Sequence, residues 1–126
     1  MKILVVDDER DVQILFEQRF RKEIREGSMK FAFAYSGEEA LGYLNTHVHE
    51  AVLRLSDINM PGISGLELLR HIKSIYKSPP PVVMMITAYG DAENFNQAMQ
   101  LGADDFLTKP LDFSSLKEKL KNTQHV

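Results

Sequence analysis

Short apolar runs alternate with amphipathic segments five times along this chain. The apolar runs lie at residues 3–6, 31–35, 51–55, 82–86 and 106–108. Continuous apolar runs of this length are typical of strands that are covered on both faces, and the segments between them repeat apolar residues at helical spacing. Strict alternation of strand and helix implies a parallel sheet with helices on both sides, joined by right-handed crossovers. The pattern does not give the order of the strands.

Polar and glycine residues mark the ends of five predicted helices. The first helix carries apolar residues from position 12 to position 24 and is predicted to end at Gly27. Residues 36–39 and 64–67 read as capping boxes that begin the second and third helices. The fourth helix, over residues 91–101, is predicted to end at Gly102, and Asp112 is predicted to cap the fifth.

Length and composition narrow the classes of protein to consider. The chain has 126 residues, of which 44 % are hydrophobic and 26 % charged, as expected for one soluble globular domain. Its net charge of -3 gives no reason to expect direct binding to nucleic acid. It contains no cysteine, its apolar runs are too short to span a membrane, and its first residues enter a strand at once. We therefore expect a cytoplasmic protein without disulfide or thiol chemistry.

Chemically active side chains follow four of the five predicted strands. They are Asp7 and Asp8 after the first, Asp57 after the third, Thr87 after the fourth and Lys109 after the fifth. The carboxyl ends of parallel strands meet at one edge of the sheet, where ligands of such folds bind. Clustered carboxylates suit a hard divalent cation, and without one their repulsion should raise the pKa of at least one carboxyl group. The set predicts a site for a divalent metal and a phosphoryl group.

Asp57 is the predicted nucleophile, because a carboxylate can attack phosphorus and form an acyl phosphate. Lys109 and the Thr87 hydroxyl would then stabilise charge on the phosphoryl oxygens. Lys109 precedes Pro110, and bonds before proline tolerate the cis form, so a fixed bend there would aim the lysine inward. Taken singly, each residue has an ordinary interpretation: a helix-capping acid, a solvated lysine, a β-branched strand residue. The four histidines lack the partners of a metal site.

These motifs together resemble a known family. The chain combines Asp7-Asp8, the run from Ser56 to Gly62, Thr87-Ala88 and Lys109-Pro110 in the order and spacing of the receiver domain of bacterial two-component response regulators, including the single-domain chemotaxis-type regulators. The resemblance covers residues 1–126. It implies an α/β fold of the flavodoxin-like, doubly wound kind, with a five-stranded parallel sheet of order 2-1-3-4-5 and five helices.

The resemblance also implies a role for each site residue. Asp57 would accept a phosphoryl group from a sensor histidine kinase or a histidine phosphotransfer protein. Mg²⁺ (or Mn²⁺) would bind Asp7, Asp8, Asp57 and the main-chain carbonyl of Asn59. Lys109 and Thr87 would contact the phosphoryl oxygens, Thr87 and Phe106 would form the switch, and Asn59 and Tyr89 would modulate hydrolysis.

The implied output is a change in the face formed by the fourth helix, the fifth strand and the fifth helix. That face would bind an output domain, a target protein or, after phosphorylation, a second copy of the chain. By this resemblance the protein is a signalling phosphoacceptor that catalyses only its own phosphorylation and dephosphorylation. It would act either alone or as the receiver of a longer protein, without direct contact to nucleic acid or membrane.

Two residues depart from the family pattern. Arg54 interrupts the third strand where an aliphatic residue is usual, so we expect a local distortion and a strand start shifted toward residues 49–51. Phe106 cannot form the hydrogen bond of the tyrosine that is common there. Two alternative functions stay open: a binding module that is never phosphorylated, and a small Mg²⁺-dependent phosphatase. The phosphatase would need an acid at position 59, which is Asn59.

Overall fold

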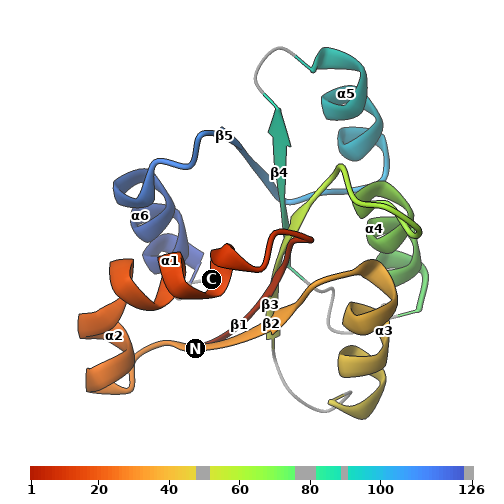
Figure 1. Cartoon of the computed structure of the whole chain (residues 1–126). Coiled ribbons are helices and arrows are strands. Elements are labelled where there is room, and N and C mark those ends of the chain that lie inside the picture. Colours follow the sequence, from red (N-terminus) through yellow and green to blue (C-terminus); the bar gives the residue numbers. More distant parts are fainter. Residues whose placement is uncertain (48–51, 76–81, 89–90, 124–126) are drawn as a thin grey trace.

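Five parallel strands form one sheet in the computed structural model, which describes residues 1–47, 52–75, 82–88 and 91–123. The strand order is β2-β1-β3-β4-β5, so the predicted order is confirmed (Figure 1). The strands are β1 (Lys2–Val6), β2 (Lys30–Ala34), β3 (Val52–Asp57), β4 (Val83–Ala88) and β5 (Asp105–Lys109). The helices are α1 (Asp11–Arg19), α2 (Arg21–Glu26), α3 (Gly37–Thr46), α4 (Gly65–Ile75), α5 (Ala92–Gln100) and α6 (Phe113–Thr123).

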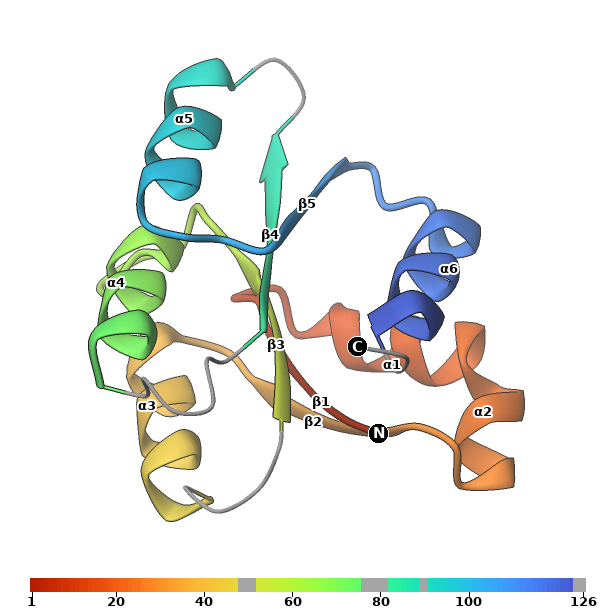
Figure 2. The ribbon, with the colours of Figure 1, turned by 180° about the vertical axis from the view of Figure 1, so that it is seen from behind.

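Helices cover both faces of the sheet, with α3, α4 and α5 on one side and α1, α2 and α6 on the other (Figures 1 and 2). Side chains from alternate strand positions fill the two resulting cores, as the pleat of a strand requires. Leu4, Val6 and Met85 belong to the core beneath α3 and α4, whereas Ile3 and Val5 belong to the core beneath α1 and α6. The fold is therefore the predicted three-layer arrangement.

The first predicted helix is divided in two, so the described residues contain six helices instead of five. The break is at Phe20, whose φ of -110° and ψ of 24° are not helical. The Phe20 ring is fully buried against Phe16 and Phe31, at centroid distances of 5.7 and 5.0 Å, so the apolar spacing continues through the break. No residue of α2 is buried, and packing therefore does not hold α2 in line with α1 (Figure 1).

The predicted capping residues are confirmed. The Ser36 hydroxyl accepts a hydrogen bond from the Glu39 amide at 3.0 Å, and the Ser64 hydroxyl accepts one from the Glu67 amide at 3.2 Å. Asp112 accepts hydrogen bonds from two amides at the start of α6, and Gly27 ends α2 with a φ of 76°. Ser36, Ser64 and Asp112 satisfy donors that the first turn of a helix leaves without partners, whereas Gly27 ends its helix in a left-handed conformation.

Arg54 does not distort β3, so that prediction is wrong for residues 52–57. Arg54 lies in register between Leu4 of β1 and Val83 of β4, and its amide donates to the Val82 carbonyl at 3.0 Å. Pairing with strands on both sides fixes the backbone at Arg54. The strand stays regular even though this charged residue is buried, with only 8 % of its surface exposed. Residues 49–51, where the strand start was predicted, lie outside the described residues. None of the described helices has the length and apolar character needed to cross a membrane.

Candidate functional site

The three predicted acids meet at the carboxyl edge of the sheet. β1 and β3 are neighbouring strands in which Val6 pairs with Ser56. Asp7 and Asp57, the next residue after each of these, therefore lie at the same level. One ligand oxygen from each of Asp7, Asp8 and Asp57 can be chosen so that all three lie within 4.8 Å of one another. Asp7 and Asp57 are buried and Asp8 is exposed. The cluster therefore has two shielded acids and one that faces solvent.

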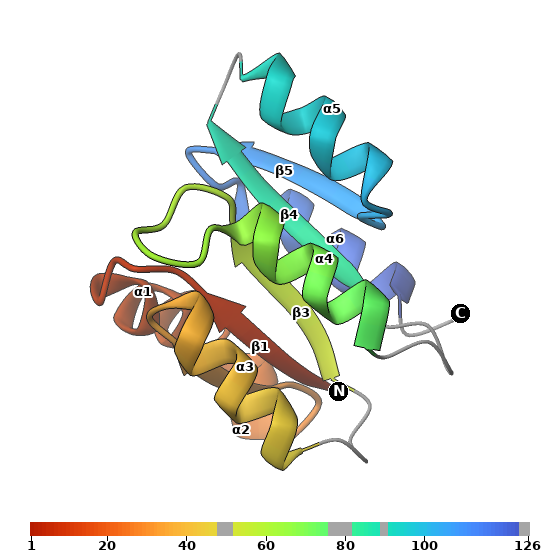
Figure 3. The same ribbon diagram turned by 90° about the vertical axis from the view of Figure 1, so that its right-hand side faces the viewer.

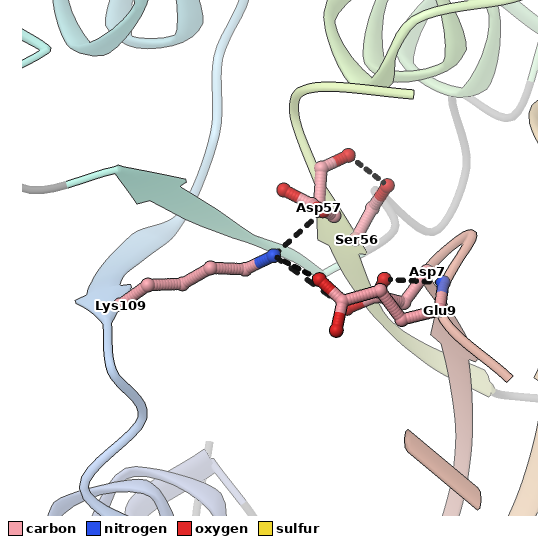
Figure 4. Close-up of polar contacts among 5 residues, drawn as sticks. All are labelled: Asp7, Glu9, Ser56, Asp57 and Lys109. Atoms are coloured by element: carbon pink, nitrogen blue, oxygen red, sulfur yellow. Dashed lines mark hydrogen bonds and ion pairs between the residues drawn. The ribbon is translucent and has the colours of Figure 1, made fainter. Parts of the chain in front are cut away.

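Lys109 supplies the positive charge at this edge. Its Nζ lies 2.9 Å from Asp57 Oδ2, 3.7 Å from Glu9 Oε1 and 3.9 Å from Asp7 Oδ2 (Figure 4). Because β4 separates β5 from β3, the lysine side chain spans a strand to reach Asp57. The peptide bond between Lys109 and Pro110 is cis. Glu9 was not among the predicted site residues, although its place directly after two acids was the available signal.

Burial, a hydrogen bond and the neighbouring charges each shift the pKa of Asp7, some upward and some downward. Burial raises the pKa of the Asp7 carboxyl, while the hydrogen bond that Oδ1 accepts from the Glu9 amide at 3.0 Å lowers it. The negative charge of Asp57 raises this pKa further and the positive charge of Lys109 lowers it, with a raised pKa as the result. The sequence predicts a raised carboxyl pKa from repulsion between acids; the pKa of Asp7 is raised, with burial as the larger cause and repulsion by Asp57 as a smaller one. Crowding of buried acids at this edge costs free energy that a cation can reduce.

The same contacts hold Lys109 in its charged form. Burial lowers the pKa of Lys109, but the hydrogen bond to Asp57 and the negative charges of Asp57, Asp7 and Glu9 outweigh burial. The pKa of Lys109 is consequently raised above its ordinary value. An ammonium group that stays charged at neutral pH beside a buried carboxylate is suited to stabilising anionic oxygens at that carboxylate.

The donor set fits a hard divalent cation. Mg²⁺ and Mn²⁺ prefer carboxylate, carbonyl and water oxygens, and Mg²⁺ typically takes only one or two carboxylates. Asp7, Asp8 and Asp57 provide such oxygens at one point, with an exposed acid on the solvent side. Burial, and to a smaller extent the negative charge of Asp57, raise the pKa of Asp7, and a divalent cation beside the carboxylate would favour its ionised form.

The backbone of Asp57 is in close contact with Ser56 and with the first residue of α4. Its carbonyl accepts a hydrogen bond from the Ser56 hydroxyl at 3.0 Å (Figure 4). The first residue of α4, Gly65, donates its amide to the Ile58 carbonyl at 2.8 Å. A Cβ at position 65 would collide with the Asp57 carbonyl oxygen and would lie 2.6 Å from the Ile58 Cα. Only glycine leaves room for α4 to begin directly beneath the acid, and this role of Gly65 was not predicted.

Thr87 and Phe106 lie on the strands beside the acid cluster. Thr87 is buried at the end of β4, one residue beyond Ile86, which pairs with Asp57. Phe106 lies on β5, and its partly buried ring contacts the Phe95 ring of α5 at a centroid distance of 4.4 Å. This contact connects β5 with the exposed surface of α5.

Asn59 and Tyr89 are the remaining residues predicted for the site. Asn59 is exposed on the segment between β3 and α4, flanked by the buried residues Ile58 and Met60. Tyr89 lies outside the described residues. The structure therefore brings Asp7, Asp8, Asp57 and Lys109 together, with Thr87 at the adjacent strand end.

Comparison with known proteins agrees with this geometry. Residues 3–121 match the family model described as response regulator receiver domain. The response regulator protein PilR of Pseudomonas aeruginosa is 40 % identical over 93 % of this chain and 24 % of its own length. Sporulation initiation phosphotransferase F of Bacillus subtilis is 32 % identical over 95 % of this chain and 90 % of its own length.

A solved structure is also similar throughout. A response regulator receiver domain protein from Clostridium thermocellum superposes with a TM-score of 0.83 at 29 % identity, over 96 % of this chain and 91 % of that one. The chain spans half or less of the length of several curated relatives that it matches. The family match over nearly all of the sequence confirms the resemblance. The chain therefore belongs to the receiver domain family of two-component response regulators, which are signalling phosphoacceptors.

Proposed function

We propose that Asp57 accepts a phosphoryl group from a phosphohistidine of a sensor histidine kinase or a histidine phosphotransfer protein. The observation that carries this proposal is the buried Asp57 carboxylate, with the Lys109 ammonium 2.9 Å from Oδ2 and two further acids beside it. In the reaction a carboxylate oxygen forms a bond to phosphorus, the bond between phosphorus and the imidazole nitrogen breaks, and the imidazole takes up a proton. Because Lys109 engages Oδ2, we assign the attack to Oδ1.

Asp7, Asp8, Asp57 and the main-chain carbonyl of Asn59 would hold Mg²⁺ or Mn²⁺. When bound, the cation supplies positive charge that offsets both the acids and the phosphoryl oxygens. Lys109 keeps its charge because its pKa is raised. Its ammonium group would therefore continue to stabilise the phosphoryl oxygens as negative charge develops on them. The buried position of Asp57 excludes bulk water from one side of the acyl phosphate.

A hollow beside Lys109 supports a protein as the phosphodonor. It has a volume of about 850 Å³ and extends from Lys109 along α1, where Ile14 and Leu15 are 59 % and 40 % exposed. Exposed apolar side chains in a hollow that reaches Asp7 and Lys109 favour docking of an apolar protein surface beside the site. The net charge of -3 does not favour nucleic acid as a direct partner.

The proposed switch runs through Thr87 and Phe106. The Thr87 hydroxyl would donate to a phosphoryl oxygen, and Phe106 would repack into the space that Thr87 leaves. The affected face consists of α5, β5 and α6, which are the predicted fourth helix, fifth strand and fifth helix. Contact between Phe106 and Phe95 supports a path from β5 to the exposed surface of α5. An output domain, a target protein or a second phosphorylated copy would bind this face.

We propose that residues 1–126 act as one receiver domain in the cytoplasm. The chain would catalyse its own dephosphorylation as well as its phosphorylation, with Asn59 and Tyr89 modulating hydrolysis. Position 59 is Asn, which argues against a phosphatase that needs an acid there as a general acid.

The test is the mass of the intact protein after incubation with acetyl phosphate, in Mg²⁺ or in EDTA. The wild type should gain one phosphoryl group only with Mg²⁺, and Asp57→Asn should gain none. Asp112→Asn is the matched control, because asparagine keeps the helix cap and the residue lies at the start of α6. No gain by the wild type, together with no binding of a beryllofluoride mimic, would refute the proposal and favour a binding-only module. Release of phosphate from external esters would favour the phosphatase.

A further inference from the structure

The segment that carries Asn59 is anchored at its base. We call residues 58–64, between β3 and α4, the β3–α4 loop. Ile58 and Met60 are 2 % and 8 % exposed, so the side chains on either side of Asn59 are fixed in the core. The Ile58 carbonyl accepts the Gly65 amide at 2.8 Å, which closes the two ends of the loop on each other. These contacts fix where the loop begins and ends, but not its far side.

The far side of the loop rests on the start of α3. Glu38 Oε1 accepts a hydrogen bond from the Ile63 amide at 3.2 Å. A Cβ on Gly62, whose φ is 73°, would lie 2.8 Å from Glu38 Oε2. A Cβ on Gly37 would lie 2.8 Å from the Ile63 Cβ and 2.9 Å from its carbonyl oxygen. Figure 3 shows the loop above the start of α3, a helix that supplies none of the site side chains Asp7, Asp8, Asp57 and Lys109.

We infer that Glu38 is a positioning residue for the cation site: its carboxylate fixes the far side of the β3–α4 loop and so orients the Asn59 carbonyl. This inference rests on the proposed function, in which that carbonyl binds the cation. Backbone carbonyl ligands are oriented by the conformation of their own loop. Outer contacts that orient metal ligands typically account for roughly 10–100-fold in metal affinity.

The neighbouring Glu39 shows why the contact of Glu38 with the loop is specific. Both acids are exposed, both lie in the first turn of α3, and both interact favourably with the helix dipole. Glu39 Oε1 accepts instead from the Tyr35 amide at 3.3 Å, on the chain segment that leads into α3. The two residues therefore match in charge and helix position but hold different segments of backbone.

The test compares Glu38→Ala, Glu38→Gln and Glu39→Ala by calorimetric titration with Mg²⁺ and by hydrogen exchange of the Ile63 amide. Glu38→Ala should weaken Mg²⁺ binding about fivefold to tenfold, at the low end of such effects because the contact is exposed. The same change should speed exchange at Ile63. Glu38→Gln keeps an acceptor oxygen and should restore both properties, whereas Glu39→Ala should leave both close to wild type.

Three outcomes would overturn the inference. They are unchanged Mg²⁺ affinity in Glu38→Ala, an equal loss in Glu39→Ala, and a failure of Glu38→Gln to restore affinity in a protein with wild-type circular dichroism. The second of these outcomes, an equal loss in both alanine variants, would indicate a simple effect of charge. If the wild type neither binds Mg²⁺ nor takes up a phosphoryl group, the proposed function fails as well, and exchange at Ile63 then reports only a loop contact.

Discussion

Alanine at two helical glycines, Gly42 and Gly65, is expected to change the stability of this protein in opposite directions. Gly42 lies in the middle of α3, exposed, and a Cβ added there would meet nothing within 4 Å. Gly65 begins α4, and a Cβ there would meet backbone atoms of Asp57 and Ile58, which are held in β3 and the core and cannot turn aside. The same substitution is thus free of contacts at one site and sterically blocked at the other.

The environments of the two glycines determine how much each substitution changes the free energy of unfolding. Gly42→Ala should stabilise the fold by about 0.5–1 kcal/mol, since alanine loses less conformational freedom in a helix than glycine. Gly65→Ala should destabilise it by about 1–3 kcal/mol, the usual cost of overpacking against a rigid neighbour. For 126 residues the unfolding entropy near the midpoint is about 0.26 kcal/mol/K. The Tm should therefore rise by about 2–4 °C in Gly42→Ala and fall by about 4–12 °C in Gly65→Ala.

Thermal unfolding followed by circular dichroism measures both shifts, and phosphorylation by acetyl phosphate measures a second consequence. Displacement of the Asp57 backbone should slow phosphorylation in Gly65→Ala, whereas Gly42→Ala should react at the wild-type rate. A Gly65→Ala protein with wild-type Tm and wild-type rate would refute the reasoning, because it would mean that α4 can retreat from Asp57 at no cost. A loss of stability in Gly42→Ala would refute the helix argument.

Three further changes test the site and its supporting helices. Lys109→Met should destabilise the metal-free protein by about 1–2 kcal/mol in urea unfolding at neutral pH, because the buried Asp57 carboxylate loses its cation. In the wild type, the stabilisation from the raised pKa of Lys109 is complete below its ordinary value of 10.5 and is lost as the pH rises through the raised pKa. Asp7→Asn should raise the metal-free Tm at neutral pH, because the raised pKa of Asp7 means that folding disfavours its ionised form. The gain in Tm should vanish as the pH falls below 3.8, the ordinary pKa of the carboxyl group. An unchanged Tm across this pH range would contradict the raised pKa of Asp7. Ser36→Ala should cost about 1 kcal/mol in thermal or urea unfolding, because the Glu39 amide loses its cap.

The edge of the sheet at which the site lies could be predicted from periodicity, whereas the order of the strands came from the resemblance to the receiver family. Parallel strands end at one edge, so the alternation of strand and helix placed Asp7, Asp57 and Lys109 at the same edge, and the strand order then made them neighbours. The caps at Ser36 and Asp112 depend on residues three or fewer positions apart, and these local signals were sufficient.

The contacts that refine the site could not be predicted, because they join distant segments without a local signal. Glu38 and Ile63 are 25 residues apart, and nothing in either stretch indicates that α3 supports the β3–α4 loop. The break at Phe20 was missed because the apolar spacing continues through it. The expected distortion at Arg54 was wrong because pairing with strands on both sides outweighs the preference of one side chain.

The reach of Lys109 across β4 has a consequence for how the protein folds. Asp57 and Lys109 are 52 residues apart, so the acids of β1 and β3 can assemble before the strand that carries their counter-charge. An intermediate with β5 still detached would contain clustered acids without the lysine, and their repulsion would favour reopening. We therefore expect divalent cations to accelerate refolding of the wild type by stabilising this intermediate, and to do so less in Asp7→Asn. A chemistry selected for signalling would then also affect the rate at which the sheet is completed.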